Sequence, residues 1–262
     1  MFTIGADPEI FVGKAGKFVS AHDMVRGDKI NPFPVEDGAV QVDGMALEFN
    51  IDPAISEEDF IRKIDKVMSQ LKGMIGDYDF LHGCSVFFTK DDVVGVPVKN
   101  FELGCSADYN AYTLSENPVP NSSLNMRTAG GHIHIGGFES DKIYRPEHFK
   151  LSAGLARAMD KYVGIYSLLW DMDDRRRELY GKAGAFRPKK YGMEYRTMSN
   201  AWIFSKDLVS FVYKQTQKAV ESYVDGERVD EGIYQDIINS SDRSHPLLKT
   251  KESNMVREMM YG

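Results

Sequence analysis

The stretch RTAGGHIHIGG, from Arg127 to Gly137, has the pattern of a strand, and the rest of the chain is best interpreted around it. Two isoleucines alternate with His132 and His134, so a period of two places both imidazoles on one face and the apolar pair on the other. Glycines crowd both ends, where a backbone can need unusual angles or approach another group closely. A strand that gives one whole face to histidines is explained more simply by a site than by a core.

The composition is that of an ordinary globular protein: 262 residues, 42% hydrophobic and 27% charged. No apolar run is long enough to span a bilayer and the amino terminus lacks the positive region of a signal peptide, so we expect no membrane association and a cytoplasmic location. A net charge of −7 and a pI near 5.4 argue against broad nucleic-acid binding. The two cysteines, Cys84 and Cys105, lack metal-ligand spacing and are interpreted as free thiols.

Alternating apolar residues predict strands over residues 2–12 and 45–51, and the turn at 13–16 predicts a hairpin that returns over 17–21. Pro8 lies inside the first strand, which predicts an edge position or a bulge, because proline cannot donate to a ladder. The turn chemistry of residues 26–40 predicts a loop.

Two helix starts are clear. Ser56 and Ser205 are favourable N-caps. An apolar stripe follows Ser56, and the helix after Ser205 extends to about Tyr223. The other predicted segments are weak strands over 79–90 and 92–101, a loop over 104–120, a helix from 146 to about 171, a basic loop over 171–191, a strand over 192–197, and two helices after residue 230. With no internal repeat and no linker, these elements predict one α+β domain over residues 1–262, with a sheet region to about 202 and a helical part over about 203–262.

Four predicted strands each carry a polar pair at positions i and i+2. These pairs are Asp7 and Glu9, Glu48 and Asn50, His132 and His134, and Glu194 and Arg196. One such pair is commonly a solvated surface feature, but four pairs with apolar residues opposite them indicate one sheet with a polar, functional face. Carboxylates outnumber imidazoles and no thiolate is offered, which favours Mg²⁺ or Mn²⁺ over structural zinc.

A basic cluster follows the long helix. It consists of Arg175, Arg176, Arg177, Lys182, Arg187, Lys189 and Lys190, with Arg127 and Arg196 from the strands. One interpretation is a solvated loop that pairs with the neighbouring acids Asp171, Asp173, Asp174 and Glu178. The other is a polyphosphate site, because guanidinium and ammonium groups beside divalent ions are what polyphosphates need. There is no Walker A motif and no G-x-G-x-x-G, so nucleotide binding would be of neither the P-loop nor the dinucleotide-fold kind.

These motifs, taken in order, resemble the phage-type carboxylate–amine ligases (amidoligase type 2), which are related to glutamine synthetase and glutamate–cysteine ligase. The resemblance extends from the first strand to about residue 202. The stretches that carry it are Gly5 to Glu9, Asp43 to Asn50, Arg127 to Gly136, Tyr180 to Gly184 with Phe186 and Arg187, and Tyr191 to Arg196 with Ser199 and Asn200.

The resemblance implies a glutamine synthetase-like catalytic domain, in which a curved, mainly antiparallel sheet is backed by helices. It also implies that ATP and two or three Mg²⁺ or Mn²⁺ ions bind on the concave face of this sheet. By the same resemblance the metal ligands are Asp7, Glu9, Glu48, His132 and Glu194. The residues expected to hold ATP are Lys182, Arg187, Lys189 and Arg196. The residues expected at the reacting phosphate are Arg127, His134, Arg187 and Arg196. In a phage-encoded protein the location would be the host cytoplasm.

The leading functional hypothesis is therefore ATP-dependent formation of an amide or peptide bond through an acyl phosphate, with a small-molecule or peptide carboxylate and an amine as substrates. Glycines in residues 171–191 predict a loop that closes over the intermediate. Three alternatives stay open at this stage: a guanidino-kinase-like phosphotransferase, a divalent-metal hydrolase, and a nucleotide-binding protein with a degenerate site. The resemblance also leaves a homo-oligomer open, although the sequence carries no interface signature.

Overall fold

The computed structural model describes residues 1–89, 91–97, 100, 107–118, 126–229 and 232–261. Its centre is an open antiparallel sheet with the strand order β3-β4-β5-β1-β10-β12-β11-β8, and β2 and β6 also pair with β1. The strands are β1 (Thr3–Lys14), β2 (Lys17–Val19), β3 (Phe33–Val35), β4 (Gly38–Asp43), β5 (Ala46–Ile51), β6 (Asp79–Leu81), β8 (Tyr109–Asn110), β10 (Gly131–Gly136), β11 (Ala185–Lys189) and β12 (Gly192–Tyr195). Two further strands, β7 (Ser85–Phe87) and β9 (Met126–Thr128), form a small separate sheet. The prediction of a mainly antiparallel sheet with helices is confirmed.

The predicted histidine strand lies near the middle of the large sheet as β10. Ile133 and Ile135 are completely buried, as the alternation predicted. On one side His132 is the register partner of Asp7 in β1, and on the other His134 is the register partner of Glu194 in β12. The sheet therefore brings residues 7 and 194 to the same strand, one on each side of it.

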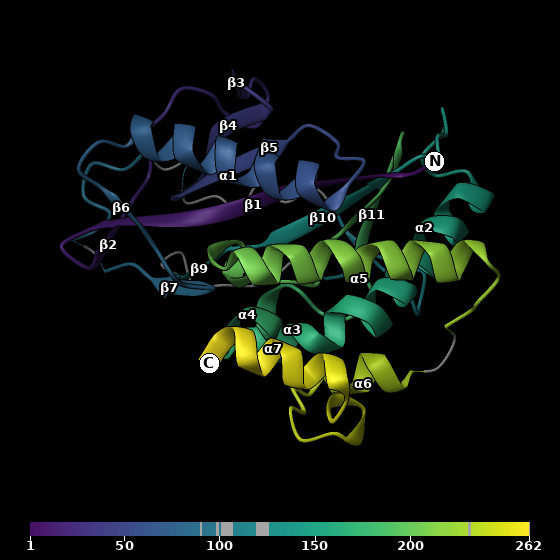
Figure 1. The fold of residues 1–262 in the computed structure, drawn as a ribbon. Helices are drawn as coiled ribbons and strands as arrows, with labels where there is room; N and C mark the ends of the chain where they lie inside the picture. Colours follow the sequence, from purple (N-terminus) through teal and green to yellow (C-terminus); the bar gives the residue numbers. More distant parts are fainter. Residues whose placement is uncertain (90, 98–99, 101–106, 119–125, 230–231, 262) are drawn as a thin grey trace.

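Helices cover the apolar face of the sheet, with α1, α2 and α5 along the strands and α6 and α7 farther away (Figure 1). The helices are α1 (Glu57–Met74), α2 (Pro146–Met159), α3 (Ile165–Trp170), α4 (Arg175–Leu179), α5 (Lys206–Val224), α6 (Ile233–Asn239) and α7 (Lys251–Tyr261), with a π-helical turn over Asp160–Gly164 and 3-10 turns over Asn200–Phe204 and Pro246–Leu248. Both predicted N-caps are confirmed, since the hydroxyls of Ser56 and Ser205 accept from the backbone N–H of Asp59 and Leu208. None of the described helices combines the length and apolar character that crossing a bilayer requires.

The opposite face of the sheet is divided between a second apolar cluster and polar side chains. Phe11 packs there with Val86, Phe88 and Ala129. Because side chains alternate along β1, Phe11 shares its face with Asp7 and Glu9. The β7–β9 sheet thus covers one end of this face and leaves the other to polar groups.

Several local predictions are wrong. Residues 26–40 contain β3 and the start of β4, and residues 92–97 form turns without a strand, while 98–99 and 101 lie outside the described residues. Pro8 is not at an edge, because β1 lies between β5 and β10. Residues alternate along β1, so the N–H of Glu9 donates to the carbonyl oxygen of Gly130 on the β10 side, whereas the nitrogen of Pro8 faces the β5 side. The pairing with β5 begins only at Glu9, so the missing N–H interrupts neither ladder.

The prediction of a loop over residues 171–191 is also wrong, because α4 and β11 form there. Gly181 and Gly184 adopt φ values of +70° and +68° in the connection between them. Pro188 lies in β11, and the pairing of β11 with β8 ends at Phe186. The edge of β11 at residue 188 therefore has no partner strand on the β8 side, and it tolerates a residue without an N–H. Cys84 is buried with a free thiol, as predicted, and Cys105 lies outside the described residues.

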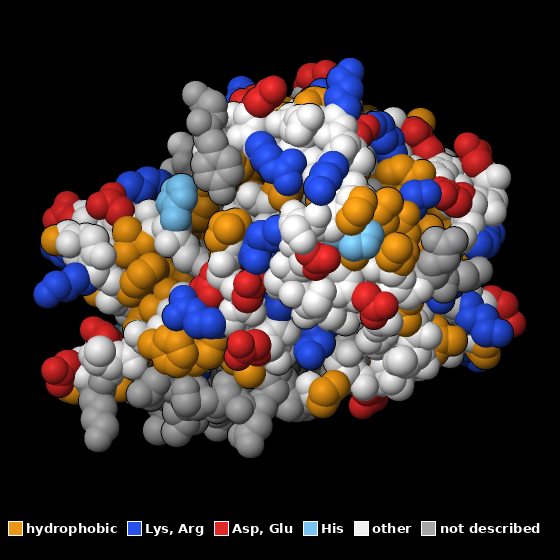
Figure 2. All heavy atoms as spheres, turned by 90° about the horizontal axis from the view of Figure 1, so that it is seen from below, with side chains coloured by type: hydrophobic (Ala, Val, Ile, Leu, Met, Phe, Trp, Pro, Cys, Tyr) orange, Lys and Arg blue, Asp and Glu red, His pale blue; other side chains and the backbone are white. Residues whose placement is uncertain are grey.

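Basic and acidic side chains are interspersed over the described part of the face seen in Figure 2. Neither sign of charge forms a broad field in this view.

Candidate active site

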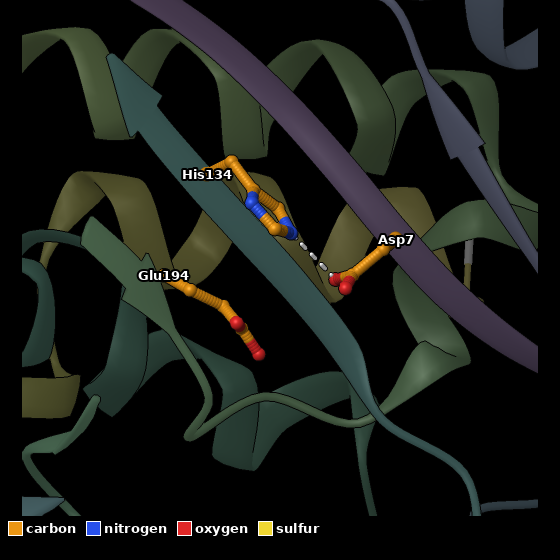
Figure 3. Close-up of side chains that lie close together, drawn as sticks. All are labelled: Asp7, His134 and Glu194. Atoms are coloured by element: carbon orange, nitrogen blue, oxygen red, sulfur yellow. Dashed lines mark ion pairs between the residues drawn. The ribbon is translucent and has the colours of Figure 1, made fainter. Parts of the chain in front are cut away.

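Three neighbouring strands place a carboxylate, an imidazole and a second carboxylate together. Asp7 of β1, His134 of β10 and Glu194 of β12 each offer one ligand atom, and these atoms all lie within 4.8 Å of one another. Figure 3 shows His134 and Asp7 pointing toward each other on the side of the strands away from the helices, with Glu194 beside them. We call these residues the acid–histidine trio.

The contacts inside the trio leave ligand atoms without hydrogen bonds. Asp7 Oδ1 lies 2.9 Å from His134 Nε2, but the two groups are not aligned as a hydrogen bond. Glu194 Oε2 is likewise buried without a hydrogen-bond partner, although Lys189 Nζ lies 2.6 Å from it. Each of these atoms is thus held by charge without an aligned hydrogen bond, and a cation placed among them could bind all three. The trio therefore fits a divalent metal.

Charges within the trio are strongly coupled. Burial opposes ionisation of Asp7, but His134 and His132 together hold the pKa of its carboxyl well below the usual range. Burial also disfavours the protonated imidazole of His134, yet Asp7 raises its pKa. Asp7 and His134 thus each favour the charged form of the other, and a metal bound here would take the place of the imidazole proton.

His132 lies beside the trio. Its Nδ1 is 3.3 Å from Asp7 Oδ1 and 3.6 Å from Glu194 Oε1. Burial, assisted by Arg196, lowers the pKa of His132 to about 4, so the imidazole is neutral, as a metal ligand must be. The glycine at 130 makes room for this ring, because a Cβ there would lie 2.2 Å from His132 Nε2. Close packing against the imidazole explains why glycine stands there.

Glu9 and Glu48 form a second acidic group on the same face. They are register partners in β1 and β5. Glu9 accepts from the backbone N–H of Gly130 at 2.8 Å, and Glu48 accepts from Gln41 Nε2 at 2.6 Å. Burial and the nearby Asp43 raise the pKa of Glu9 to about 7, and burial and Asp7 raise that of Glu48. The local cations do not offset the repulsion among these acids.

Three cations surround Glu194. Arg196 Nη1 donates to Glu194 Oε1, and Arg187 Nη1 lies 3.7 Å from the same oxygen. Lys189 Nζ contacts the other oxygen. Burial disfavours the charged carboxylate, but Arg196 prevails and lowers the pKa of Glu194. The structure therefore brings Arg187, Lys189 and Arg196 to the trio, where the sequence predicted phosphate-binding groups.

Lys182 is placed differently. Its side chain is exposed, and it is the carbonyl oxygen of Lys182 that accepts from Thr197 Oγ1 at 3.0 Å. Gly181, beside it, packs so closely that a Cβ there would lie 1.8 Å from Arg176 Nη1. Packing thus accounts for this glycine, and closure of the segment over an intermediate stays a prediction.

A pocket opens next to the trio and combines charges of both signs. Glu9, Asp43 and Asp108 line it together with Arg127, Arg176 and Arg196. Arg127 is buried, with Nη1 donating to the carbonyl oxygen of Met126 at 2.7 Å, and burial lowers its pKa. Arg127 therefore faces the pocket rather than joining the three cations at Glu194.

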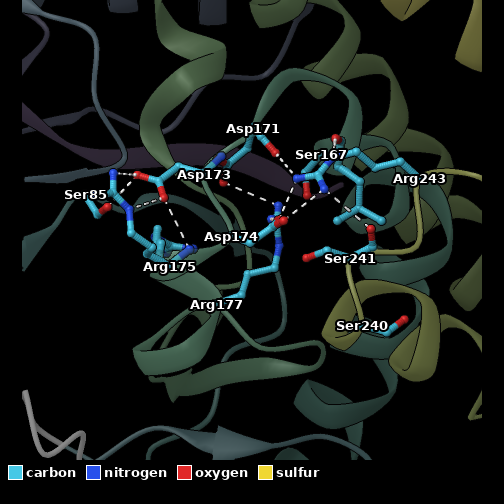
Figure 4. Close-up of polar contacts among 12 residues, drawn as sticks. Ser85, Ser167, Asp171, Asp173, Asp174, Arg175, Arg177, Ser240, Ser241 and Arg243 are labelled. Atoms are coloured by element: carbon cyan, nitrogen blue, oxygen red, sulfur yellow. Dashed lines mark hydrogen bonds and ion pairs between the residues drawn. The ribbon is translucent and has the colours of Figure 1, made fainter.

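Most of the remaining basic cluster is structural. Arg175 pairs with Asp173 at 2.8 Å, and Arg177 pairs with Asp171 at 3.3 Å (Figure 4). The interpretation as ion pairs with neighbouring acids is right for these two arginines. Arg176 instead donates to the carbonyl oxygens of Thr197 and Arg196, so it supports the backbone that carries Arg196.

Sequence reasoning missed three contributors to the site. Asp108 contacts Arg196 Nε at 3.2 Å from a segment interpreted as an irregular loop, where only its charge could have suggested a role. Asp43 lies beside Glu9 and pairs with Lys29 at 2.8 Å. Tyr191 donates to or accepts from His134 Nδ1 through its hydroxyl, a contact that no spacing rule predicts.

Comparison with known proteins finds a family model that matches part of the chain. Residues 121–235 match the family model described as phage phiEco32-like COOH-NH2 ligase type 2. The match contains His132, His134, Glu194 and Arg196, and it confirms the predicted resemblance to phage-type amidoligases over these residues. Asp7, Glu9 and Glu48 lie outside it. No curated protein matches the chain.

Proposed function

From the match of residues 121–235 to a carboxylate–amine ligase family, we propose that this chain is an ATP-dependent amidoligase that works through an acyl phosphate. The observation that carries the proposal is the acid–histidine trio, whose three ligand atoms all lie within 4.8 Å of one another. Arg187, Lys189 and Arg196 gather on its Glu194. Metal-type acids and phosphate-type cations on one sheet face are what a nucleotide-dependent ligase needs.

The divalent ions, Mg²⁺ or Mn²⁺, would be held by two groups of ligands. The trio offers one, and Glu9 with Glu48 offers another, which supports the expectation of more than one ion. His132 lies beside Asp7 and Glu194, so its neutral imidazole can add a fourth ligand to the trio. Such ions neutralise the oxygens of a transferring phosphoryl group. They would also offset the burial and the repulsion that raise the pKa of Glu9 and Glu48.

The triphosphate of ATP would meet Arg187, Lys189 and Arg196. In the metal-free protein these cations are held by Glu194. A metal that takes the carboxylate of Glu194 would free part of their hydrogen-bonding capacity for phosphate oxygens. Arg127 and Arg176, in the adjoining pocket, would then face the carboxylate substrate or the terminal phosphate.

The reaction would proceed in two steps. A carboxylate oxygen of the first substrate attacks the terminal phosphorus of ATP, the bond to the bridging oxygen breaks, and ADP leaves. The amine then attacks the carbonyl carbon of the acyl phosphate, inorganic phosphate leaves, and the ammonium loses a proton to give the amide. Arg196 and its neighbours would stabilise the charge on the phosphoryl oxygens in both steps.

The test is a coupled assay for ADP in the presence of Mg²⁺, ATP and a panel of carboxylates and amines. We expect ADP release that depends on both substrates, and an amide product in the mass spectrum. Glu194→Gln should abolish it, whereas Glu178→Gln, a matched change on the exposed side of α4, should leave it unchanged.

Three results would overturn the proposal. ADP release without an amine and with a stable phosphorylated product would identify a kinase. Turnover without nucleotide would identify a hydrolase. No release with any pair of substrates, in a protein that binds Mn²⁺, would point to a degenerate site.

A further inference from the structure

Tyr191 holds the imidazole of His134 from the side opposite the acids. It lies between β11 and β12, and its hydroxyl forms a hydrogen bond with His134 Nδ1. The two rings are 5.8 Å apart between centroids and tilted by 38°, so the contact is made by the hydroxyl rather than by stacking. His134 Nε2 is thereby left facing Asp7 Oδ1 at 2.9 Å.

The backbone around Tyr191 is fixed to the strand that carries His134. The carbonyl oxygen of Tyr191 accepts from the N–H of Phe138 at 3.1 Å, and that of Lys190 accepts from the N–H of Ser140 at 2.7 Å. Phe138 and Ser140 closely follow β10. The tyrosine and the histidine are therefore tied together by backbone bonds as well as by side chains, which keeps the hydroxyl in place.

The two histidines of β10 present different nitrogens to the acids. His132 turns Nδ1 toward Asp7 and Glu194, whereas His134 turns Nε2 toward Asp7. A neutral imidazole carries its proton on the nitrogen that does not bind metal, and the partner of that nitrogen decides which one it is. At His134 that partner is the hydroxyl of Tyr191.

We propose that Tyr191 is a positioning residue that accepts a hydrogen bond from Nδ1–H of His134 and so keeps the lone pair of Nε2 directed at the metal. The inference rests on the proposed metal site and deepens it, because His134 then ligates metal instead of contacting the phosphate. Removing the hydroxyl leaves the ring and the backbone in place but frees His134 to rotate or to change tautomer.

The experiment measures free Mn²⁺ by electron paramagnetic resonance during titration of the metal-free protein. We expect Tyr191→Phe to weaken Mn²⁺ binding about 10- to 100-fold, as removal of such hydrogen-bond partners does elsewhere. His134→Ala should weaken it at least as much. Tyr144→Phe, a change at another exposed tyrosine, should bind as the unaltered protein does. Thermal unfolding of each variant in EDTA checks that the fold is retained.

The outcomes separate the two proposals. If the unaltered protein binds no Mn²⁺, the proposed metal site is wrong and this inference falls with it. If the unaltered protein and Tyr191→Phe bind Mn²⁺ equally, the role of Tyr191 is wrong while the metal site stands.

A second measurement needs no altered tyrosine. Long-range ¹H–¹⁵N spectra of the Mg²⁺-saturated protein report which nitrogen of His134 carries the proton, with the resonance assigned from its loss in His134→Asn. We expect the proton on Nδ1, and a proton on Nε2 would overturn the inference.

Discussion

Gly130→Ala tests how tightly the packing holds His132 in the site. A Cβ at residue 130 would lie 2.2 Å from Nε2 of His132, 2.8 Å from Cε1 and 2.9 Å from Cδ2. Ordinary van der Waals contact begins near 3.4 Å, so the imidazole must move by about 1.2 Å. The ring is rigid and its side chain is buried between Asp7 and Glu194, so it cannot swing into solvent.

We expect two measurable effects from this change. Overpacking should lower the free energy of unfolding in EDTA by about 1–3 kcal/mol, measured with urea. The shift of Nδ1, now 3.3 Å from Asp7, should weaken Mn²⁺ binding at least about tenfold, because a ligand displaced by more than about 0.5 Å loses its geometry.

Gly73→Ala provides the control for Gly130→Ala. Residue 73 lies in α1, and a Cβ added there would meet no atom within 4 Å, so alanine should stabilise the helix by about 1 kcal/mol and leave Mn²⁺ binding alone. If Gly130→Ala retains both the stability and the Mn²⁺ affinity of the unaltered protein, close packing against His132 is not the reason for glycine at this position.

Two further predictions concern charge. The pKa of Glu9 is raised from 4.5 to about 7 on folding, so the folded state holds a proton that the unfolded state has lost, and the stability of the metal-free protein should fall as pH rises across that window. Glu9→Gln should remove this part of the pH dependence in urea unfolding, and an unchanged slope would contradict the assignment. Arg243 donates hydrogen bonds to the carbonyl oxygens of Leu168 and Asp171 and to the carboxylate of Asp174 (Figure 4). Arg243→Ala should therefore cost about 2 kcal/mol of unfolding free energy, against almost nothing for the exposed Arg145→Ala, and equal losses would show that these bonds contribute no stability.

Much of the sheet could be predicted because its residues alternate. In β10, two isoleucines alternate with two histidines, which predicts that the isoleucines face the core. The structure confirms this orientation, because Ile133 and Ile135 are completely buried. The N-caps Ser56 and Ser205 were equally readable, because a hydroxyl that accepts from the third residue is a local interaction.

Other features depended on contacts that are distant in sequence. Residues 171–191 looked like a loop because of their glycines and proline, but pairing of β11 with β12 and packing of Gly181 against Arg176 override those local preferences. Side-chain rotation decides which nitrogen each histidine turns toward the acids. The contact of Tyr191 with His134 joins residues that are 57 positions apart in the sequence.

The sequence was enough to predict which residues belong to the site, but not how their side chains are arranged in space. Polar pairs at i and i+2 identified the face, since a period of two is enough to place them. Both histidines reach Asp7, through Nε2 of His134 and Nδ1 of His132, and this geometry depends on side-chain rotation that only the structure provides.

Anomalous X-ray diffraction from crystals grown with Mn²⁺ and a non-hydrolysable ATP analogue would locate the proposed metal ions and phosphates in a single experiment. We predict manganese peaks within bonding distance of Asp7, His134 and Glu194 and beside Glu9 and Glu48, with the analogue's phosphates on Arg187, Lys189 or Arg196. Manganese bound only at surface acids, or phosphates bound away from this face of the sheet, would contradict the proposed site.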